Sequence, residues 1–369
     1  MNKPITVTQP CLPPLEEFMP YLQQIWDNKW LTNNGPLHNQ LEKELAEYLG
    51  VKFISLFSNG TLALISALQA LNITGEVITT PFSFVATTHS LWWNKITPVF
   101  VDIEPEYLNL DPAKIEAAIT SKTTAIMPVH VYGNPCQMDE IRSIAEKHDL
   151  KVIYDAAHAF GVKQKDESIL NFGDLSVLSF HATKVFSTIE GGAIICHSQE
   201  MKHHIDNLKN FGFRDETIVE EPGINAKLNE VQAAYGLLQL KYIDGFISKR
   251  KEITQLYQLL LKDILGIRFL SDIENVTHCY SYFPILVDEC KYEISRDALY
   301  NKLKQNNIFA RRYFYPLISN FEPYHKLSSS LPENLPTATK AAVQVLCLPI
   351  FVDLSEMDIR SICSIIKEK

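Results

Sequence analysis

The sequence lacks the features that mark membrane and secreted proteins. No run reaches the ~18 uninterrupted apolar residues that a membrane span requires. Residues 1–7 lack the apolar core of a secretory signal, and no internal repeat or low-complexity segment is present. We therefore expect a cytoplasmic protein that has no membrane partner.

Paired cysteines are also absent. The seven cysteines are odd in number and widely scattered, and none forms a CxxC pair. This pattern indicates neither a disulfide framework nor a zinc site. We expect buried free thiols in a reducing cytoplasm, and no metal site.

Basic residues are fewer than acidic residues in this chain. The chain has 34 Lys and Arg residues against 43 Asp and Glu residues, a formal net charge of -9. This balance argues against nucleic acid as a partner, and no helix-turn-helix pattern or basic cluster is visible. No G-x-G-x-x-G motif follows the first predicted strand, which argues against a nicotinamide enzyme.

An ordinary globular composition is present, with 46% hydrophobic and 21% charged residues in 369 residues. Short β-rich runs alternate with helical patterns through the first two-thirds of the chain, which predicts an α/β fold with a mainly parallel sheet. The predicted strands are 53–57, 76–80, 98–102, 125–129, 151–155, 175–180 and 193–196. Helices are predicted at 37–49, which Gly50 ends, and at 61–71.

A long helical pattern begins near residue 240, with apolar residues Ile243, Ile247, Ile253, Leu256 and Leu260. We expect this helix to link the large α/β domain to a smaller C-terminal α+β domain. The predicted domains are residues 1–245 and 246–369.

Two charged residues stand at the ends of predicted strands. Lys184 follows the strand 175–180, and Asp155 ends the strand 151–155. A lysine and a carboxylate in these places suggest a pyridoxal 5'-phosphate (PLP) site. The amine can hold the aldehyde as a Schiff base, and the carboxylate can keep the pyridine nitrogen protonated. Taken alone, Lys184 is better explained as a solvated surface lysine, and Asp155 as a strand-end or helix-capping aspartate. The joint placement of these residues with the other candidates supports the site.

Further candidates follow other strands, where open α/β sheets place their ligands. Phe84 is either a ring that stacks on a cofactor or a core aromatic. His130 follows one strand, and His158 either orients the cofactor's phenolic oxygen or is a hydrogen-bonded core histidine. The run Ser58-Asn59-Gly60-Thr61 resembles a phosphate cup at a helix start, although an ordinary helix cap explains it as well. Ser179 can add a hydroxyl donor to the phosphate.

Seven motifs in one order resemble the DegT/DnrJ/EryC1/StrS nucleotide-sugar aminotransferases, which have the aspartate-aminotransferase fold, fold type I. They occupy residues 31–36, 58–64, 76–85, 129–133, 155–159, 179–184 and 190–193.

This resemblance implies PLP, and its pyridoxamine form (PMP), as the cofactor. Lys184 resembles the family's Schiff-base lysine, and Asp155 the pyridinium partner. Phe84 resembles the stacking aromatic, and His158 the residue beside the ring oxygen. The phosphate ligands that it implies are Gly60, Thr61 and Ser179.

The resemblance also implies a homodimer whose active site lies at the subunit interface. The segment Gly223-Ile224-Asn225-Ala226-Lys227 is similar to a family segment whose asparagine reaches the cofactor phosphate of the neighbouring subunit. Asn225 would therefore act in trans. Lys227 and Tyr315 are implied ligands of the substrate's pyrophosphate, and Asn34 is a further implied substrate residue.

The chain departs from the family pattern in three places. Tyr154 stands where many members have Glu, 185–188 differs from the commoner run, and Ile318 replaces a frequent His. These departures concern the substrate more than the cofactor.

Within the family, the amino-acid sequences of residues 155–161 and 181–186 are most similar to those of enzymes that aminate dTDP-4-keto-6-deoxy-D-glucose with L-glutamate. The product, dTDP-4-amino-4,6-dideoxy-D-glucose, would serve O-antigen or other surface polysaccharide biosynthesis. The alternative on the same scaffold is a C3 aminotransferase that acts on a dTDP-3-keto-6-deoxyhexose. Two further alternatives are a PLP-dependent sugar dehydratase, which in the family has His in place of Lys184, and a non-enzymatic regulatory protein.

Overall fold

A computed structural model of the chain describes residues 4–32 and 34–368. Asn33 of the 31–36 motif and residues 1–3 of the N-terminal segment lie outside the described residues. Within the described part of the chain, none of the helices is long and apolar enough to cross a membrane.

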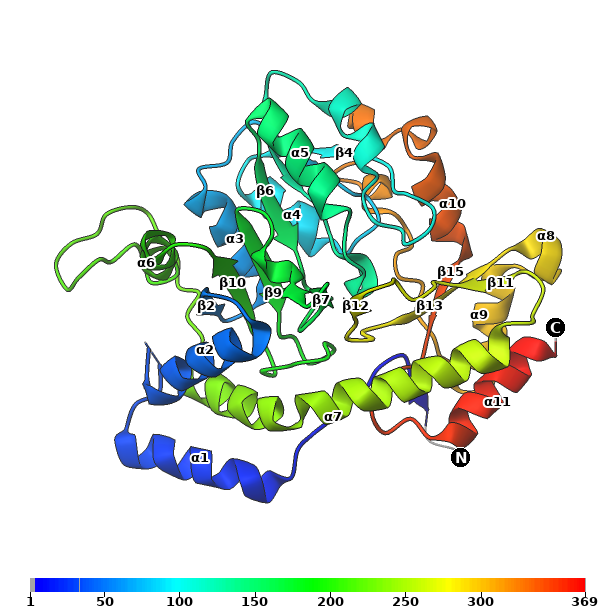
Figure 1. Cartoon of the computed structure of the whole chain (residues 1–369), viewed down its shortest axis with the longest axis horizontal. Coiled ribbons are helices and arrows are strands. Elements are labelled where there is room, and N and C mark those ends of the chain that lie inside the picture. Colours follow the sequence, from blue (N-terminus) through cyan, green and yellow to red (C-terminus); the bar gives the residue numbers. More distant parts are fainter. Residues whose placement is uncertain (1–3, 33, 369) are drawn as a thin grey trace.

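One large sheet forms the centre of the molecule (Figure 1). Among the described residues it has seven strands in the order β2-β10-β9-β6-β5-β3-β4. Their bounds are β2 Phe53–Phe57, β3 Glu76–Thr79, β4 Thr97–Phe100, β5 Thr123–Met127, β6 Lys151–Asp155, β9 Leu175–Ser179 and β10 Gly192–Cys196. β10 runs antiparallel to both neighbours, and the other paired strands run parallel. The predicted α/β class with a mainly parallel sheet is confirmed.

Helices cover both faces of this sheet. The helices before the C-terminal part are α1 Leu15–Asn28, α2 Pro36–Leu49, α3 Gly60–Ala70, α4 Ala86–Trp93, α5 Met138–His148, α6 Gln199–Leu208 and α7 Glu230–Leu261. α3, α4 and α6 contribute to the apolar core on one face, while α2, α5 and α7 contribute to the core on the other. Consecutive residues of a strand therefore enter opposite cores. In β6, Val152 and Tyr154 pack on one side and Ile153 on the other.

The C-terminal part has its own small antiparallel sheet, β11-β13-β15. The bounds here are β11 Ile267–Phe269, β13 Phe283–Val287, β15 Val345–Leu348, α8 Glu289–Tyr292, α9 Arg296–Gln305, α10 Pro336–Gln344 and α11 Glu356–Lys367. Two minor sheets join β1 Ile5–Thr6 to β14 Ile308–Phe309, and β12 Val276–Thr277 to β7 Lys163–Gln164 and β8 Glu167–Ser168.

Helix α7 runs beneath both parts of the molecule (Figure 1). Asn229 caps its start in a capping box with Gln232. Leu237 packs in the core of the large sheet, whereas Tyr257 packs in the C-terminal core. Because the helix passes unbroken through residue 245, the expected linking helix is present, and the division of the chain at that residue stays a prediction.

The segment after β14 returns to the large sheet. Phe314 packs edge-on against Phe82 at a centroid distance of 5.6 Å and stacks on Tyr132 at 6.0 Å. This return places C-terminal side chains near the ends of the central strands, where the candidate site lies.

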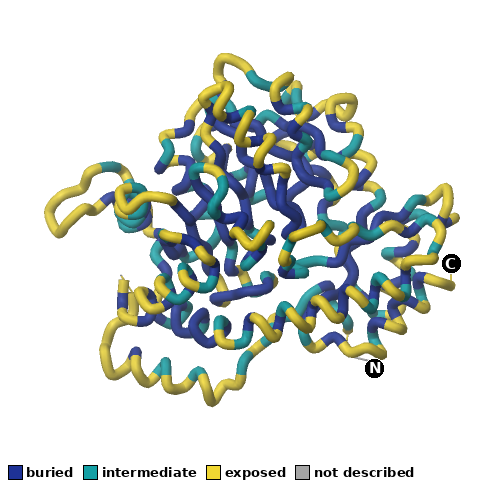
Figure 2. Tube along the Cα trace, viewed as in Figure 1, coloured by how far each residue is buried: buried dark blue, intermediate teal, exposed yellow. Residues whose placement is uncertain are grey.

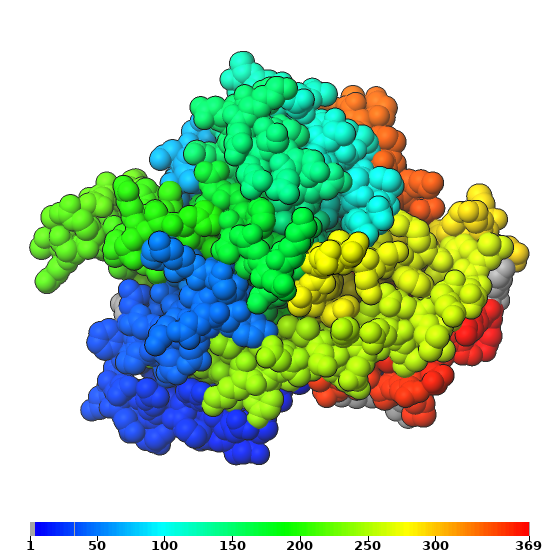
Figure 3. Space-filling model, viewed as in Figure 1, coloured from blue at the N-terminus to red at the C-terminus, as the bar shows by residue number. Residues whose placement is uncertain are grey.

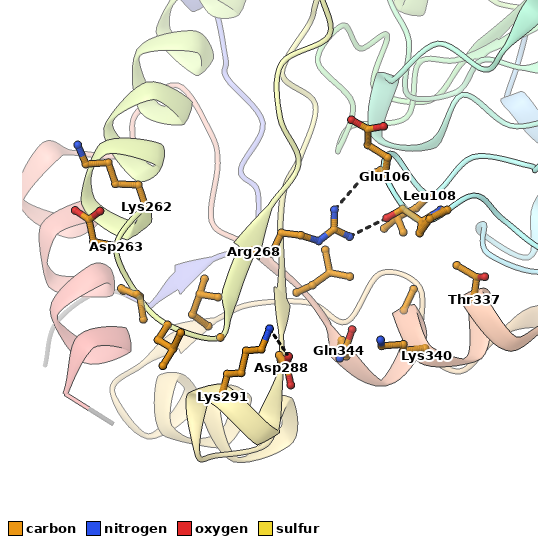
Figure 4. A pocket seen from close by; sticks show the side chains of 17 residues that line it. Glu106, Leu108, Lys262, Asp263, Arg268, Asp288, Lys291, Thr337, Lys340 and Gln344 are labelled. Atoms are coloured by element: carbon orange, nitrogen blue, oxygen red, sulfur yellow. Dashed lines mark hydrogen bonds and ion pairs between the residues drawn. The ribbon is translucent and has the colours of Figure 1, made fainter.

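A cleft of about 770 Å³ separates the C-terminal sheet from the loop after β4 (Figure 4). Arg268 of β11 crosses it and donates hydrogen bonds to the carbonyl oxygens of Pro105, at 3.0 Å, and Glu106, at 3.2 Å. None of the predicted site residues lines this cleft.

The strands of the central sheet are mostly buried, whereas the outer faces of the helices and many loops are exposed (Figure 2). Cys290 is exposed and Cys11 is half-buried, so the expectation of buried thiols fails at these two positions. The other cysteines are buried.

Glu230 ties the start of α7 to the start of α2. Its buried carboxylate accepts hydrogen bonds from the amides of Leu37, at 3.0 Å, and His38, at 2.7 Å. Its own amide donates to the Leu31 carbonyl oxygen at 2.9 Å. We expect Glu230→Ala to lower the free energy of unfolding by about 3 kcal/mol, because two buried helix amides lose their acceptor.

Urea unfolding monitored by circular dichroism measures this loss. Glu47→Ala, at an exposed position on the same helix α2, is the control and should change stability by less than about 0.5 kcal/mol. A loss below about 1 kcal/mol for Glu230→Ala would contradict the capping role.

Candidate active site

Most of the predicted site residues line one cavity of about 310 Å³. It lies where the segments after β2, β3, β6 and β9 meet. The predicted residues that line it are Gly60, Thr61, Phe84, Asp155, His158, Ser179 and Lys184. Strands β6 and β9 are neighbours in the sheet, with Asp155 opposite Val177, and this pairing brings Asp155 and Lys184 to the same opening.

Lys184 occupies a short turn after β9. Its amide donates to the His181 carbonyl oxygen at 2.8 Å, and its side chain reaches into the cavity. The Nζ atom donates a hydrogen bond to the Tyr282 hydroxyl at 3.3 Å. Burial lowers the pKa of Lys184 to about 8, although the nearby Asp155 carboxylate opposes the change. An amine with this pKa exchanges its proton readily near neutral pH.

Asp155 is held by hydrogen bonds on both carboxylate oxygens. Oδ2 accepts from the Thr87 hydroxyl at 2.7 Å, and Oδ1 accepts from the Ala157 amide at 3.1 Å. Burial raises the pKa of Asp155, while the Thr87 and Ala157 hydrogen bonds and the charge of Lys184 pull it down. A cation placed against this carboxylate would favour its ionised form further.

His158 has a defined tautomer when neutral. Its Nδ1 accepts a hydrogen bond from the Tyr132 amide at 3.2 Å, so the proton resides on Nε2. Burial, and then the charge of Lys184, lower the pKa of His158 well below the ordinary value. The ring stacks on Phe314 at a centroid distance of 5.9 Å and an angle of 6°. His158 therefore offers a neutral N–H donor.

The start of α3 leaves backbone amides free for an anion. Asn59 caps the helix by accepting from the Leu62 amide at 2.9 Å. Among the described residues, the amides of Gly60 and Thr61 have no hydrogen-bond acceptor. A Cβ added to Gly60 would lie 3.0 Å from the Ser179 Cβ atom, and one on Gly192 would lie 2.7 Å from the Gly60 nitrogen. A Cβ at Gly192 would collide with the backbone at Gly60, and one at Gly60 would crowd Ser179, so glycine at both positions keeps a cradle open at this helix N-terminus.

Of the candidates Phe84 and His130, the first lines the cavity and the second does not. Phe84 lines the cavity and is 58% exposed, so its ring is open to a ligand. His130 does not line the cavity. It is fully buried, accepts from the Cys136 amide at 3.0 Å and stacks on Tyr154 at 4.7 Å. Its position after a strand was misleading because its ring points into the core.

Four predicted residues lie on the surface of the chain, outside the cavity. Asn225 is exposed, and its side-chain oxygen accepts from Lys227 Nζ at 2.8 Å. Tyr315 is 41% exposed and lies against the Arg296 guanidinium at 4.7 Å. Asn34 is exposed in the loop before α2. The structure of one chain does not bring these residues to its own cavity.

Sequence reasoning missed four residues of the site. Thr87 lies one helical turn after Phe84, a spacing that could have marked it. Tyr282, Tyr313 and Phe314 line the cavity from the C-terminal part. They follow Lys184 by about a hundred residues or more and belong to no motif, so the sequence carries no signal for them.

The low pKa of Lys184 has a measurable consequence in the ligand-free protein. Only the neutral amine reacts with a reductive methylation reagent, so labelling of Lys184 should rise with pH with a midpoint near 8, against about 10.4 for an ordinary lysine. Asp155→Asn should lower this midpoint further, because the carboxylate favours the charged ammonium.

Mass spectrometry of the Lys184 peptide across a pH series measures the midpoint. Asp166→Asn, at an exposed position outside the cavity, should leave it unchanged. A midpoint above about 10 in the unmodified protein would contradict the desolvated site.

Comparisons with known proteins agree with this geometry. Residues 15–367 match the model of the DegT/DnrJ/EryC1/StrS aminotransferase family. The chain is 58% identical over 368 residues to a dTDP-4-amino-4,6-dideoxy-D-glucose transaminase of Shigella dysenteriae, covering 100% of both chains. It is 56% identical to an Escherichia coli protein of the same name, covering 96% of each. A crystal structure of DesI in the presence of its TDP-sugar product matches with a TM-score of 0.95 and 33% identity, covering 100% of this chain and 93% of that one. The chain therefore belongs to the DegT/DnrJ/EryC1/StrS aminotransferase family and is a transaminase.

Proposed function

We propose that the protein uses PLP to move the amino group of L-glutamate onto C4 of dTDP-4-keto-6-deoxy-D-glucose. The product would be dTDP-4-amino-4,6-dideoxy-D-glucose. The observation that carries this proposal is the full-length identity of 58% to a transaminase named for that product, in a chain whose Lys184 and Asp155 share one cavity.

The residues of the cavity fit PLP in four respects. The free amides of Gly60 and Thr61, with the Ser179 hydroxyl, suit the phosphate. The exposed ring of Phe84 offers a flat surface for the pyridine.

The cavity also offers partners for the ring nitrogen and the ring oxygen of PLP. Asp155 supplies a carboxylate for the ring nitrogen, and His158 an N–H donor for the ring oxygen. When bound, PLP carries the amino group between substrates and withdraws electrons from the reacting carbon. Lys184 holds the cofactor and moves the proton at that carbon, which its pKa of about 8 permits near neutral pH.

The alternatives have less support. A dehydratase of this family has His where this chain has Lys184. A regulatory protein would not need a buried amine and carboxylate in one cavity. A C3 aminotransferase would use the same cavity, and the names of the two relatives, both for a 4-amino sugar, favour C4.

We further propose a homodimer in which Asn225 completes the neighbouring active site. The segment after α6 projects from the body of the chain (Figures 1 and 3). It exposes five large apolar residues, which favours burial against a partner: Phe211, Phe213, Ile218, Val219 and Ile224. Lys227, Tyr315 and Asn34 would then bind substrate at the interface. We also propose a cytoplasmic location and a role in O-antigen or other surface polysaccharide biosynthesis.

The function is tested by incubating the protein with PLP, glutamate and either dTDP-4-keto-6-deoxy-D-glucose or a dTDP-3-keto-6-deoxyhexose. We expect a 4-amino product, identified by NMR, and 2-oxoglutarate in equal amount. Lys184→Ala should lower turnover by at least about a thousandfold, because no other group in the cavity can replace the amine.

Lys43→Ala, at an exposed lysine of α2, is the matched control and should retain full activity. Turnover by Lys184→Ala within about tenfold of the unmodified protein would refute the role of the lysine. Inactivity of the unmodified protein on both sugars would refute the substrate assignment.

The trans role of Asn225 predicts complementation between two inactive variants. Lys184→Ala and Asn225→Ala subunits, co-expressed with different tags, form hybrid dimers in which one site is defective twice and the other is intact. Random pairing should restore about a quarter of the activity. If Asn225 served its own chain, both sites of the hybrid would remain defective and no activity would return.

A further inference from the structure

Tyr282 contacts the amine of Lys184 from the C-terminal part of the chain. It lies just before β13, and its hydroxyl accepts the hydrogen bond from Lys184 Nζ at 3.3 Å. The same Nζ atom lies 5.8 Å from the centre of the Tyr282 ring. Among the described residues, this hydrogen bond is the one that the Tyr282 hydroxyl makes. The hydroxyl is therefore free to serve the lysine alone.

Neighbouring aromatic rings hold the Tyr282 ring in place. His158 packs edge-on at a centroid distance of 4.9 Å, and Tyr313 packs edge-on at 5.8 Å. Tyr132 lies at 5.7 Å. These contacts leave the ring little freedom to turn, so the hydroxyl is a fixed point in the cavity wall.

The backbone on either side is also held. The Ser281 hydroxyl donates to the His158 carbonyl oxygen at 2.6 Å. The buried Arg250 of α7 donates to the carbonyl oxygens of Tyr280 and Ser281, each at 3.4 Å. The segment 280–282 is thus anchored both to the large sheet, through the Asp155–His158 turn, and to α7.

A lysine side chain has a flexible four-carbon stem, and its amine has to stay within reach of the reacting carbon when it is not bonded to the cofactor. Asp155 attracts the amine from one side of the cavity, although the two groups make no direct hydrogen bond. Tyr282 offers the amine a hydrogen-bond acceptor that stays neutral, because burial raises the pKa of its hydroxyl far above the ordinary value.

We propose that Tyr282 is a positioning residue that holds the free amine of Lys184 by accepting its hydrogen bond. By accepting from the ammonium, the hydroxyl also stabilises the charged form of the lysine relative to a cavity without it. The effect on catalysis depends on the proposed function, whereas the contact itself does not.

The test compares Tyr282→Phe with Tyr280→Phe. Tyr280 is in the same segment, is half-buried and packs on His278 rather than on Lys184. In each cofactor-free variant, reductive methylation of Lys184 is followed across a pH series by mass spectrometry. We expect the midpoint of labelling to fall by roughly half to one pH unit in Tyr282→Phe and to stay constant in Tyr280→Phe.

In the PLP-loaded enzyme, kcat with glutamate should fall about tenfold in Tyr282→Phe, with KM for glutamate changed by less than about twofold. The proposal is overturned if the midpoint of Tyr282→Phe equals that of the unmodified protein, if it rises, or if Tyr280→Phe shows the same fall. A fall in the midpoint, in a protein that transaminates neither sugar, would refute the proposed function and support the positioning role.

Discussion

The site depends on one constraint, the placement of an amine and a carboxylate in the same desolvated cavity. Strands β6 and β9 pair in parallel, so their carboxyl ends open at one edge of the sheet, and Asp155 and Lys184 meet there. Burial raises the pKa of Asp155 and lowers the pKa of Lys184, and the opposite charge of each group counteracts that shift in the other. The surrounding contacts, from Thr87 on one side to Tyr282 on the other, keep the two side chains oriented.

The C-terminal part contributes more to this site than its distance along the chain suggests. Tyr282, Tyr313 and Phe314 form one wall of the cavity, and α7 joins the two apolar cores beneath it. A displacement of the C-terminal sheet relative to the large sheet would therefore move the contact to Lys184. Arg268, which crosses the cleft to the carbonyl oxygens of Pro105 and Glu106, ties the C-terminal sheet to the loop after β4 and restrains such a displacement.

Much of the large sheet and of the helices around it could be predicted from the sequence. β2 and β6 have the predicted bounds, and Gly50 ends α2 in a left-handed conformation as the helix pattern indicated. The strands could be predicted because a strand that is covered on both faces has a short, continuous run of apolar residues. The antiparallel direction of β10 could not be predicted from the sequence, because a buried strand has the same composition in either direction. His130 was misjudged for a related reason, since a position after a strand does not say where the ring points.

The sequence by itself determined the family, and it singled out Lys184 and Asp155 as the candidate reactive lysine and its carboxylate partner, because these depend on local motifs whose residue types the chemistry requires. The tertiary structure decided which candidates share a cavity, which wall the C-terminal part supplies, and how far the pKa of Lys184 falls. Those properties follow from burial and from contacts between residues about a hundred positions apart, and no local pattern records them. Asn225, Lys227, Tyr315 and Asn34 stand at the surface of the single chain, where their predicted roles require a second subunit.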